Sequence, residues 1–187
     1  MLRVWLVSLV VMAASFCSDC VSASDESKTE TVATERMVLP CLSDGSTFDL
    51  SKQKARYVVL HFLLKTECPF CLKHTRDYAS LAATTPGVIH LFLKPDSIAE
   101  IKAWAGKTRK EGVKDAPQIY RDPDAKLAKQ FGIPDGYKFH GQTVHFPALV
   151  VLDGQGKELF RYIGKDNSDR VKPKDFLAKL AEATAKR

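Results

Sequence analysis

Cys68 and Cys71 are separated by two residues in the segment KTECPFCLKH, and Pro69 directly follows the first of them. A cysteine pair at this spacing can be a redox-active dithiol, part of a metal site or a structural staple. With Cys68 as the N-cap and Pro69 as the first helical residue, the pair opens a helix. Both sulfurs then lie at the positive end of the helix dipole, which stabilises a thiolate over a thiol.

This helix start predicts different roles for the two sulfurs. Cys68 is expected to be the exposed nucleophile with a lowered pKa, whereas Cys71 lies about one turn further into the helix and is shielded. Cys71 could then attack a mixed disulfide at Cys68 and release the partner. Lys65 and Lys73 add positive charge that favours the thiolate. The spacing therefore favours a redox pair.

The pair needs a strand ahead of it and a helix behind it, and the flanking sequence predicts both. Residues 57–64, YVVLHFLL, are apolar apart from one histidine, as in a strand covered on both faces. After the cysteines, apolar residues recur at helical spacing until TTPG at 84–87 ends the helix. VIHLFL at 88–93 predicts a second buried strand, and the crossover rule makes the two strands parallel.

The rest of the chain predicts an α/β fold with one mixed sheet and helices on both faces. Ahead of the first core strand, residues 37–50 predict a hairpin that turns at Asp44-Gly45. Residues 132–146 are expected to form a loop. The remaining predicted elements are a charged helix near 97–110, a short strand around 117–120, a helix over 124–131, an antiparallel hairpin over 147–163 and a closing helix over 173–185.

These motifs resemble the thioredoxin superfamily. CPFC lies between a buried strand and a helix, and a distant proline opens FPALVVLDGQG. VLPCLSDGSTFDL is similar to the N-terminal hairpin of the redoxin branch, which holds the peroxiredoxins and the exported cytochrome-maturation thioredoxins. The resemblance runs from Met37 to the C-terminus and implies a thioredoxin-like fold without a cofactor. It also implies Cys68 as nucleophile, Cys71 as resolving cysteine and Pro147 as a cis-proline that presents backbone to an incoming chain.

Two other members of this superfamily supply alternative functions. Peroxiredoxins carry a threonine three residues before the reactive cysteine and an arginine near a later strand, whereas here Lys65 holds the first place and no arginine lies near VHFPAL. A peroxide reductase is one alternative. Copper chaperones of the Sco type also read threonine-x-cysteine-proline, although three residues separate their cysteines. By that resemblance Cys68, Cys71 and His145 could hold Cu(I), because thiolates are soft ligands.

Several other residues have two interpretations each. His61 lies close to where thioredoxins keep a buried group that relays a proton, or it is a core histidine bonded to backbone. Phe146 stands where thioredoxins have an aliphatic residue or threonine, so it would lie against the sulfurs and narrow the partner set. His74 is expected to be an exposed helix residue. Cys41 is either a small buried hydrophobe or a resolving cysteine.

The N-terminus predicts export. Residues 1–23 combine an early arginine, an apolar stretch too short for the roughly 20 residues of a membrane span, and small residues spaced like a cleavage site. We interpret them as a signal peptide. Residues 24–36 are rich in Ser, Thr and Glu and predict a flexible tether, so that residues 37–187 form the domain. The protein is therefore expected to be periplasmic or secreted, with membrane contact only through an uncleaved signal.

Composition limits the class of partner. The net charge is +6, but the basic residues are scattered rather than clustered with aromatic residues, which disfavours nucleic-acid binding. The expected partners are the thiols or disulfides of exported proteins, together with a membrane or soluble redox donor. After cleavage three of the five cysteines would remain, an odd number for an oxidising compartment.

Overall fold

The domain is described from a computed structural model. It covers the following residues: 37–42, 44–65, 68–110, 117–139 and 141–185. All of them belong to one compact unit, Thr31–Arg187. The predicted signal peptide 1–23 and tether 24–36 lie outside the described residues. Within the described ranges, no helix has the length and apolar character needed to cross a membrane.

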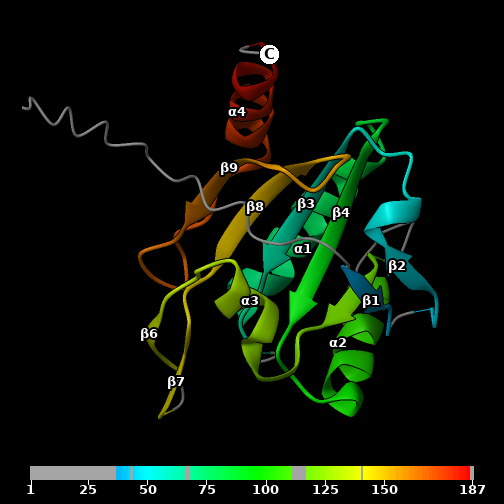
Figure 1. The fold of residues 1–187 in the computed structure, drawn as a ribbon. Coiled ribbons are helices and arrows are strands. Elements are labelled where there is room, and N and C mark those ends of the chain that lie inside the picture. The colour runs from blue at the N-terminus through cyan, green and yellow to red at the C-terminus, as the bar shows by residue number, and fades with distance from the viewer. Residues whose placement is uncertain (1–36, 43, 66–67, 111–116, 140, 186–187) are drawn as a thin grey trace, which may run out of the picture. The chain divides into compact units, whose positions relative to one another are not determined.

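A mixed five-stranded sheet forms the centre of the domain (Figure 1). Its order is β5-β4-β3-β8-β9, with β3, β4 and β5 parallel and with β8 antiparallel to both of its neighbours. The predicted parallel pair and the C-terminal hairpin are thus confirmed. The strands are β3 (Tyr57–Phe62), β4 (Val88–Lys94), β5 (Ile119–Arg121), β8 (Ala148–Asp153) and β9 (Glu158–Ile163).

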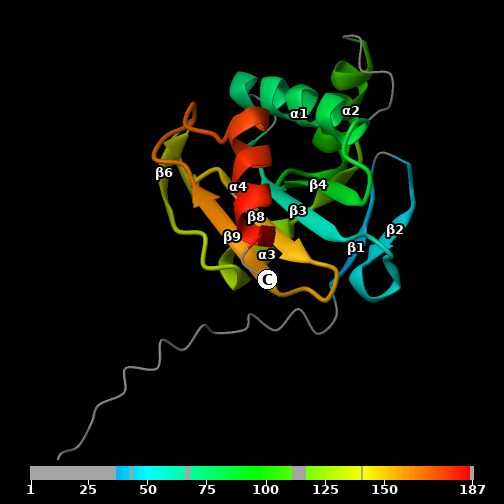
Figure 2. The ribbon, with the colours of Figure 1, turned by 90° about the horizontal axis from the view of Figure 1, so that it is seen from above.

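The side chains of β3 alternate between two cores. Val58, Leu60 and Phe62 join one cluster, and Val59 faces the other, which also contains both site cysteines. The cluster on the cysteine side is covered by α1 (Pro69–Ala82), α2 (Ile98–Lys110) and α4 (Pro173–Ala185). Figure 2 shows α1 and α2 next to each other on one side of the sheet.

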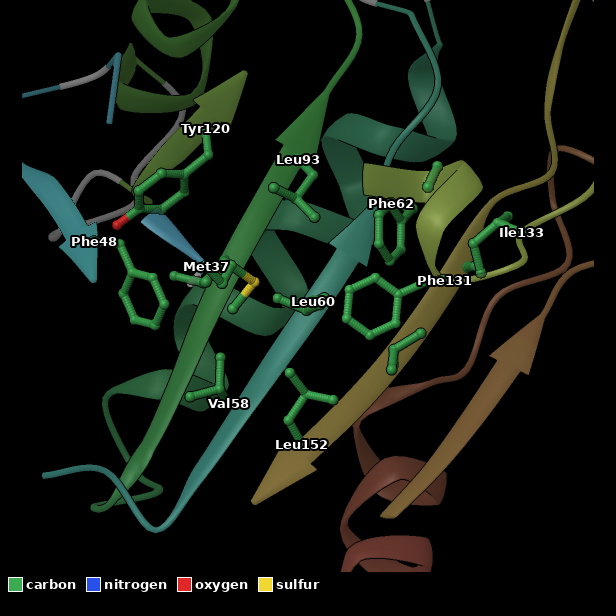
Figure 3. Close-up of a cluster of buried hydrophobic side chains, with 14 of the residues drawn as sticks. Met37, Phe48, Val58, Leu60, Phe62, Leu93, Tyr120, Phe131, Ile133 and Leu152 are labelled. Carbon is green, nitrogen blue, oxygen red and sulfur yellow. The ribbon is translucent and has the colours of Figure 1, made fainter. Parts of the chain in front are cut away.

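The opposite face of the sheet is covered by shorter elements. Figure 3 shows Phe131 and Ile133 packed near Phe62 and Leu60 on this face. Its cover consists of η2 (Pro123–Ala125), α3 (Lys126–Gln130), the hairpin of β1 (Val38–Pro40) and β2 (Thr47–Asp49), and η1 (Leu50–Lys52). The predicted architecture, a mixed sheet with helices on both faces and an N-terminal hairpin, is confirmed.

The N-terminal hairpin is attached to the β5 edge of the sheet. Cys41 forms an antiparallel bridge with Tyr120, and the Leu42 amide donates to the Ile119 carbonyl at 2.8 Å. The turn is stabilised by Asp44, whose carboxylate accepts bonds from the amide and hydroxyl of Ser46. The hairpin therefore closes one edge of the sheet as well as part of one face.

Two predicted elements differ in the structure. The loop expected over 132–146 contains a second small hairpin, β6 (Asp135–Phe139) and β7 (Gln142–His145). Tyr137 and Val144 pair across its two strands and pack against the core, and Gly141 turns with φ +76°. The helix expected over 124–131 is divided into η2 and α3, because the backbone has positive φ at Asp124 and Ala125.

Candidate active site

Cys68 begins helix α1 as the sequence predicts. It is the N-cap, Pro69 follows in the first turn, and the Cys71 amide donates to the Cys68 sulfur at 3.1 Å. This bond satisfies one of the amide groups that every helix start leaves unpaired. It also directs a backbone dipole at the sulfur, which stabilises negative charge there.

The expected exposure of Cys68 is wrong. Its residue surface is only 1% exposed and that of Cys71 is fully buried. The cover is the segment between β9 and α4, residues 164–172, which we call the β9–α4 loop. From this loop, Asn167 Oδ1 accepts a hydrogen bond from the Cys68 thiol at 2.9 Å. A partner can therefore reach Cys68 only when this contact opens.

The same loop brings an arginine to both sulfurs. Arg170 Nη2 lies 3.3 Å from the Cys71 sulfur and 3.7 Å from the Cys68 sulfur. The sequence has no arginine near VHFPAL, but the fold supplies one to the site from a loop farther along the chain. Arg170 follows β9 in a polar loop, so no local sequence pattern connects it with a motif about 100 residues earlier.

The β9–α4 loop is held by its own acidic residues. Asp166 accepts from the Ser168 amide and hydroxyl and from the Asp169 amide, while Asp169 accepts from the Tyr162 hydroxyl and the Lys165 amide. The loop also folds tightly on Gly164, where an added Cβ atom would lie only 2.2 Å from the Asp169 carbonyl oxygen. These bonds fix Asn167 and Arg170 over the cysteine pair.

A second cation lies on the core side of the site. Lys94, at the end of β4, is completely buried, donates to the Leu64 carbonyl at 2.6 Å and pairs with Asp96 at 3.5 Å. Its ammonium group also sits 4.5 Å from the centre of the Trp104 ring. The sequence held a signal for this residue, because parallel strands end at the same edge and Lys94 ends the neighbour of the strand before the pair.

The two thiols have opposite pKa shifts. A hydrogen bond from the Cys71 thiol, aided by the Arg170 guanidinium, the Cys71 amide and Lys94, lowers the pKa of Cys68 to about 6, although burial opposes this. Burial, together with that same hydrogen bond, raises the pKa of Cys71 well above its ordinary value. Near neutral pH the site therefore holds one thiolate and one thiol.

Ionisation of Cys68 changes its contact with Asn167. A thiol can donate to the Asn167 oxygen, but a thiolate cannot, and the two partners would then repel each other. Rotation of the amide would present the NH₂ group of Asn167 to the thiolate, but it would also break the bond that Asn167 Oδ1 accepts from Arg170 Nη2 at 3.3 Å.

Three buried histidines lie behind the pair, and the sequence indicated only one of them. His61 Nδ1 is 2.9 Å from His74 Nε2, and His61 Nε2 is 2.9 Å from His90 Nδ1. The prediction that His74 is exposed is wrong, because it lies on the buried face of α1. His61 bonds to imidazoles rather than to backbone. His90 shares its face of the sheet because β3 and β4 are in parallel register.

All three imidazoles are held neutral. Burial, with the positive charge of Arg170 next, lowers the pKa of His74 to about 3; burial lowers that of His90 to about 4 and that of His61 far below its ordinary value. Each of the two nitrogen contacts needs one proton. Three neutral imidazoles carry three protons, so the third proton lies on either His74 Nδ1 or His90 Nε2. The latter is buried without a hydrogen-bond partner, which favours His74 Nδ1.

The cis-proline prediction for Pro147 is wrong in this structure. The bond from Phe146 to Pro147 is trans, as are all peptide bonds among the described residues. The chain stays extended here because Phe146 N donates to the Pro134 carbonyl and Pro147 O accepts from Gly164 N at 2.8 Å, which continues the pairing of β8 with β9. Pro147 nevertheless lines a small pocket with His74 and Arg170.

The other expected site residues lie apart from the sulfurs. The Phe146 ring packs on Tyr137 with centroids 6.1 Å apart, and His145 donates from Nδ1 to the Phe146 carbonyl and packs beside Phe62. Within the described ranges no three Cys, His or carboxylate side chains are grouped to hold a metal, so Cys68, Cys71 and His145 are not brought together. Lys65 contributes its carbonyl, which accepts from the Cys68 amide.

Cys41 belongs to the cluster on the other face of the sheet from Cys68 and Cys71. Its thiol hydrogen-bonds Asp44, and this bond is the largest contribution that lowers the pKa of that carboxyl. The geometry therefore fits the buried hydrophobe and disfavours the resolving role, because the sheet separates Cys41 from the site pair.

The fold and the paired thiols at a helix start define a thioredoxin-like redoxin. A family model described as AhpC/TSA matches residues 31–157, and the chain belongs to this family. Its members are oxidoreductases, so a general redox function follows for this chain. No curated protein sequence matches the chain.

Solved structures with similar folds include both peroxiredoxins and disulfide oxidoreductases. A peroxiredoxin-like protein from Aquifex aeolicus is 14% identical, covers 79% of this chain and 83% of its own, and gives a TM-score of 0.63. The bacterioferritin comigratory protein of Xanthomonas campestris is 18% identical, covers 80% of this chain and 91% of its own, and gives a TM-score of 0.60. A secreted Mycobacterium tuberculosis disulfide oxidoreductase homologous to E. coli DsbE is 17% identical, covers 82% of this chain and 98% of its own, and gives a TM-score of 0.56. These likenesses establish the fold.

The neutral histidines predict a stability that falls in acid. Their folded pKa values lie below the unfolded value of about 6.5, so the unfolded state binds more protons as the pH falls below 6.5. Each histidine should then remove about 1.4 kcal/mol of unfolding free energy per pH unit, down to about pH 4. Urea unfolding of the wild type and of His90→Phe between pH 7 and 4.5 measures this slope. The variant should lose the contribution of one histidine, about 1.4 kcal/mol per pH unit; a flat wild-type profile would contradict the neutral assignment.

Proposed function

We propose that the protein is an exported thiol-disulfide oxidoreductase that uses Cys68 and Cys71 to exchange disulfides with partner proteins. The observation that carries this proposal is the opposite pKa shift of two sulfurs within one helical turn, both in contact with Arg170. Disulfide exchange needs an ionised attacking sulfur and a second sulfur that stays protonated until the mixed disulfide forms. The site meets both conditions.

The proposed reaction has two steps. The Cys68 thiolate attacks a partner disulfide, whose S–S bond breaks as one partner sulfur leaves as a thiolate. Cys71 then gives up its proton and attacks the Cys68 sulfur, which forms the Cys68–Cys71 disulfide and releases the second partner sulfur. The partner gains two electrons and two protons, one proton from Cys71 and one from water. The reverse sequence oxidises a partner dithiol.

Arg170 supports both steps. While Cys68 is ionised, the guanidinium balances its charge from 3.7 Å. Formation of a mixed disulfide removes that charge, and Arg170 then acts on Cys71 alone from 3.3 Å. Burial is the main cause of the raised pKa of Cys71, and the hydrogen bond and charge of Cys68 add to it; the mixed disulfide removes these two contributions, so the resolving thiol becomes easier to ionise when it is needed.

The expected partners are thiols or disulfides of other exported proteins, with a membrane or soluble protein that renews the redox state of the pair. This part of the proposal rests on the sequence of residues 1–23 and on the oxidising compartments where protein disulfides persist. Because the β9–α4 loop covers Cys68, a partner must displace Asn167 to react.

Peroxide reduction is the second candidate function, and Arg170 is the observation that favours it. A guanidinium beside the thiolate can stabilise the charge that develops on the oxygens of a peroxide. Family membership agrees with this alternative. Against it, Lys65 stands where peroxiredoxins carry a threonine hydroxyl, and a second cysteine follows one helical turn after the first.

Replacement of Cys71 by serine should trap partners. The resolving attack is lost in Cys71→Ser, so disulfides between Cys68 and exported proteins should accumulate in cells and disappear on reduction. Non-reducing gels followed by mass spectrometry would identify them. Cys71→Ser/Cys41→Ser should trap equally well, and Cys68→Ser should trap none. Exchange is contradicted if Cys71→Ser captures no protein under conditions in which it is stably expressed.

Hydrogen peroxide should react slowly with the reduced protein. A missing charge-stabilising donor of this kind typically costs about two to three orders of magnitude in rate. Stopped-flow oxidation should therefore be no faster than that of an ordinary thiol with a similarly low pKa. A rate close to the diffusion limit would instead establish the peroxide reductase and displace our first choice.

A further inference from the structure

An open pocket of about 270 Å³ lies beside the cysteine pair, between the first turns of α1 and the β9–α4 loop. Phe70, Lys73 and His74 line it from the helix, and Arg170 and Lys172 line it from the β9–α4 loop. Arg170 also contacts both sulfurs, so a molecule in this pocket lies next to the reacting atoms. The volume suits one or two side chains of a bound polypeptide.

The charges in the pocket are mainly positive. Lys73 is paired with Asp77 at 2.6 Å, and this pair adds little net charge. Lys172 forms no ion pair with any residue that the structure describes, and its side chain is exposed. His74 is neutral, as shown above. Lys172, which has no ion-pair partner among the described residues, and Arg170, whose charge is shared with the Cys68 thiolate, therefore give the pocket its positive character.

Arg170 keeps one nitrogen available to a ligand. Its Nε donates to the Asn167 carbonyl at 3.2 Å, and its Nη2 serves the sulfurs and the Asn167 side chain. Among the described residues, Nη1 has no hydrogen-bond acceptor. Guanidinium groups bind carboxylates through N–H donors of this kind.

Phe70 gives the pocket an apolar wall. It is one of the two residues between the cysteines, and 44% of its surface is exposed, which makes it one of the few large apolar side chains on the surface of the described domain. A solvent-exposed aromatic ring beside reactive groups is a common anchor at interfaces. The pocket thus combines an apolar surface with two cations.

We propose that this pocket binds an acidic side chain of the partner polypeptide next to the partner's reacting cysteine, with its methylene groups on Phe70 and its carboxylate on Arg170 and Lys172. The inference rests on the proposed exchange function and names the substrate class of the same site: disulfides flanked by glutamate or aspartate. Binding there places the partner sulfur beside Cys68.

The test uses three short peptides, each dimerised through a single cysteine, that differ only in having Glu, Gln or Lys beside that cysteine. At low salt we expect kcat/KM to be highest for the Glu peptide, intermediate for the Gln peptide and lowest for the Lys peptide. The Glu and Lys peptides should differ about tenfold, and this difference should shrink at high salt. Lys172→Gln should lower kcat/KM for the Glu peptide about two- to fivefold and leave the Gln peptide unchanged. Lys174→Gln removes an exposed lysine that does not line the pocket and is the matched control.

Equal kcat/KM for the three peptides, or a Glu preference that Lys172→Gln leaves undiminished, would overturn the inference while leaving exchange intact. Failure of every peptide to react would count against the exchange function itself. The pocket is then tested separately by the non-covalent binding of peptides in which serine replaces the cysteine. Amide chemical shifts at Phe70 and Lys172 should move with the Glu peptide and not with the Gln peptide; no movement with either peptide would refute the pocket assignment.

Discussion

The site depends on stabilising one negative charge, the Cys68 thiolate, at a position that is almost completely buried. A thiolate at Cys68 has almost no contact with water, and the loss of hydration costs several kcal/mol for an ion in a protein interior. Protein groups must therefore replace the solvent. The Cys71 amide and thiol, Arg170 and Lys94 do so from the helix, the loop and the core.

Much of the surrounding architecture follows from that need. The β9–α4 loop has to place a guanidinium against two sulfurs, and the carboxylates of Asp166 and Asp169 hold its turns while Gly164 permits its close return. The three histidines differ from the cations at the sulfurs because they carry no charge. Because they lie in the core near Arg170, they remain uncharged and bond to one another. The site therefore holds its cations close to the sulfurs and neutral groups behind them.

The sequence predicted what local chemistry determines. Pro69 after Cys68 indicated the helix start, the apolar runs indicated β3 and β4, and Asp44-Gly45 indicated the hairpin. The β6–β7 hairpin was missed because its polar composition resembles a loop, and the pairing of Tyr137 with Val144 across its two strands is visible only in the structure. Lys94 could have been anticipated, since it ends the strand that neighbours the one before the pair.

Other features of the site depend on contacts that no short pattern contains. Arg170 and Asn167 meet Cys68 across about 100 residues, and the fold alone brings them together. The same contact reversed the expectation that Cys68 is exposed. His74 was misjudged because a histidine on a helix is equally compatible with either face, and only the packing of α1 over His61 and His90 decides between them.

The central claim is that Arg170 sustains a thiolate at a buried Cys68, and site-resolved alkylation of the reduced protein tests it most directly. Iodoacetamide labelling of Cys68, read by mass spectrometry across pH, should give a pKa of about 6 in the wild type and in the control Lys165→Met. In Arg170→Met the pKa should rise above that of the wild type and the control, because the positive charge beside the sulfur is lost. A pKa unchanged by Arg170→Met, or an ordinary value of about 8.5 in the wild type, would contradict the account.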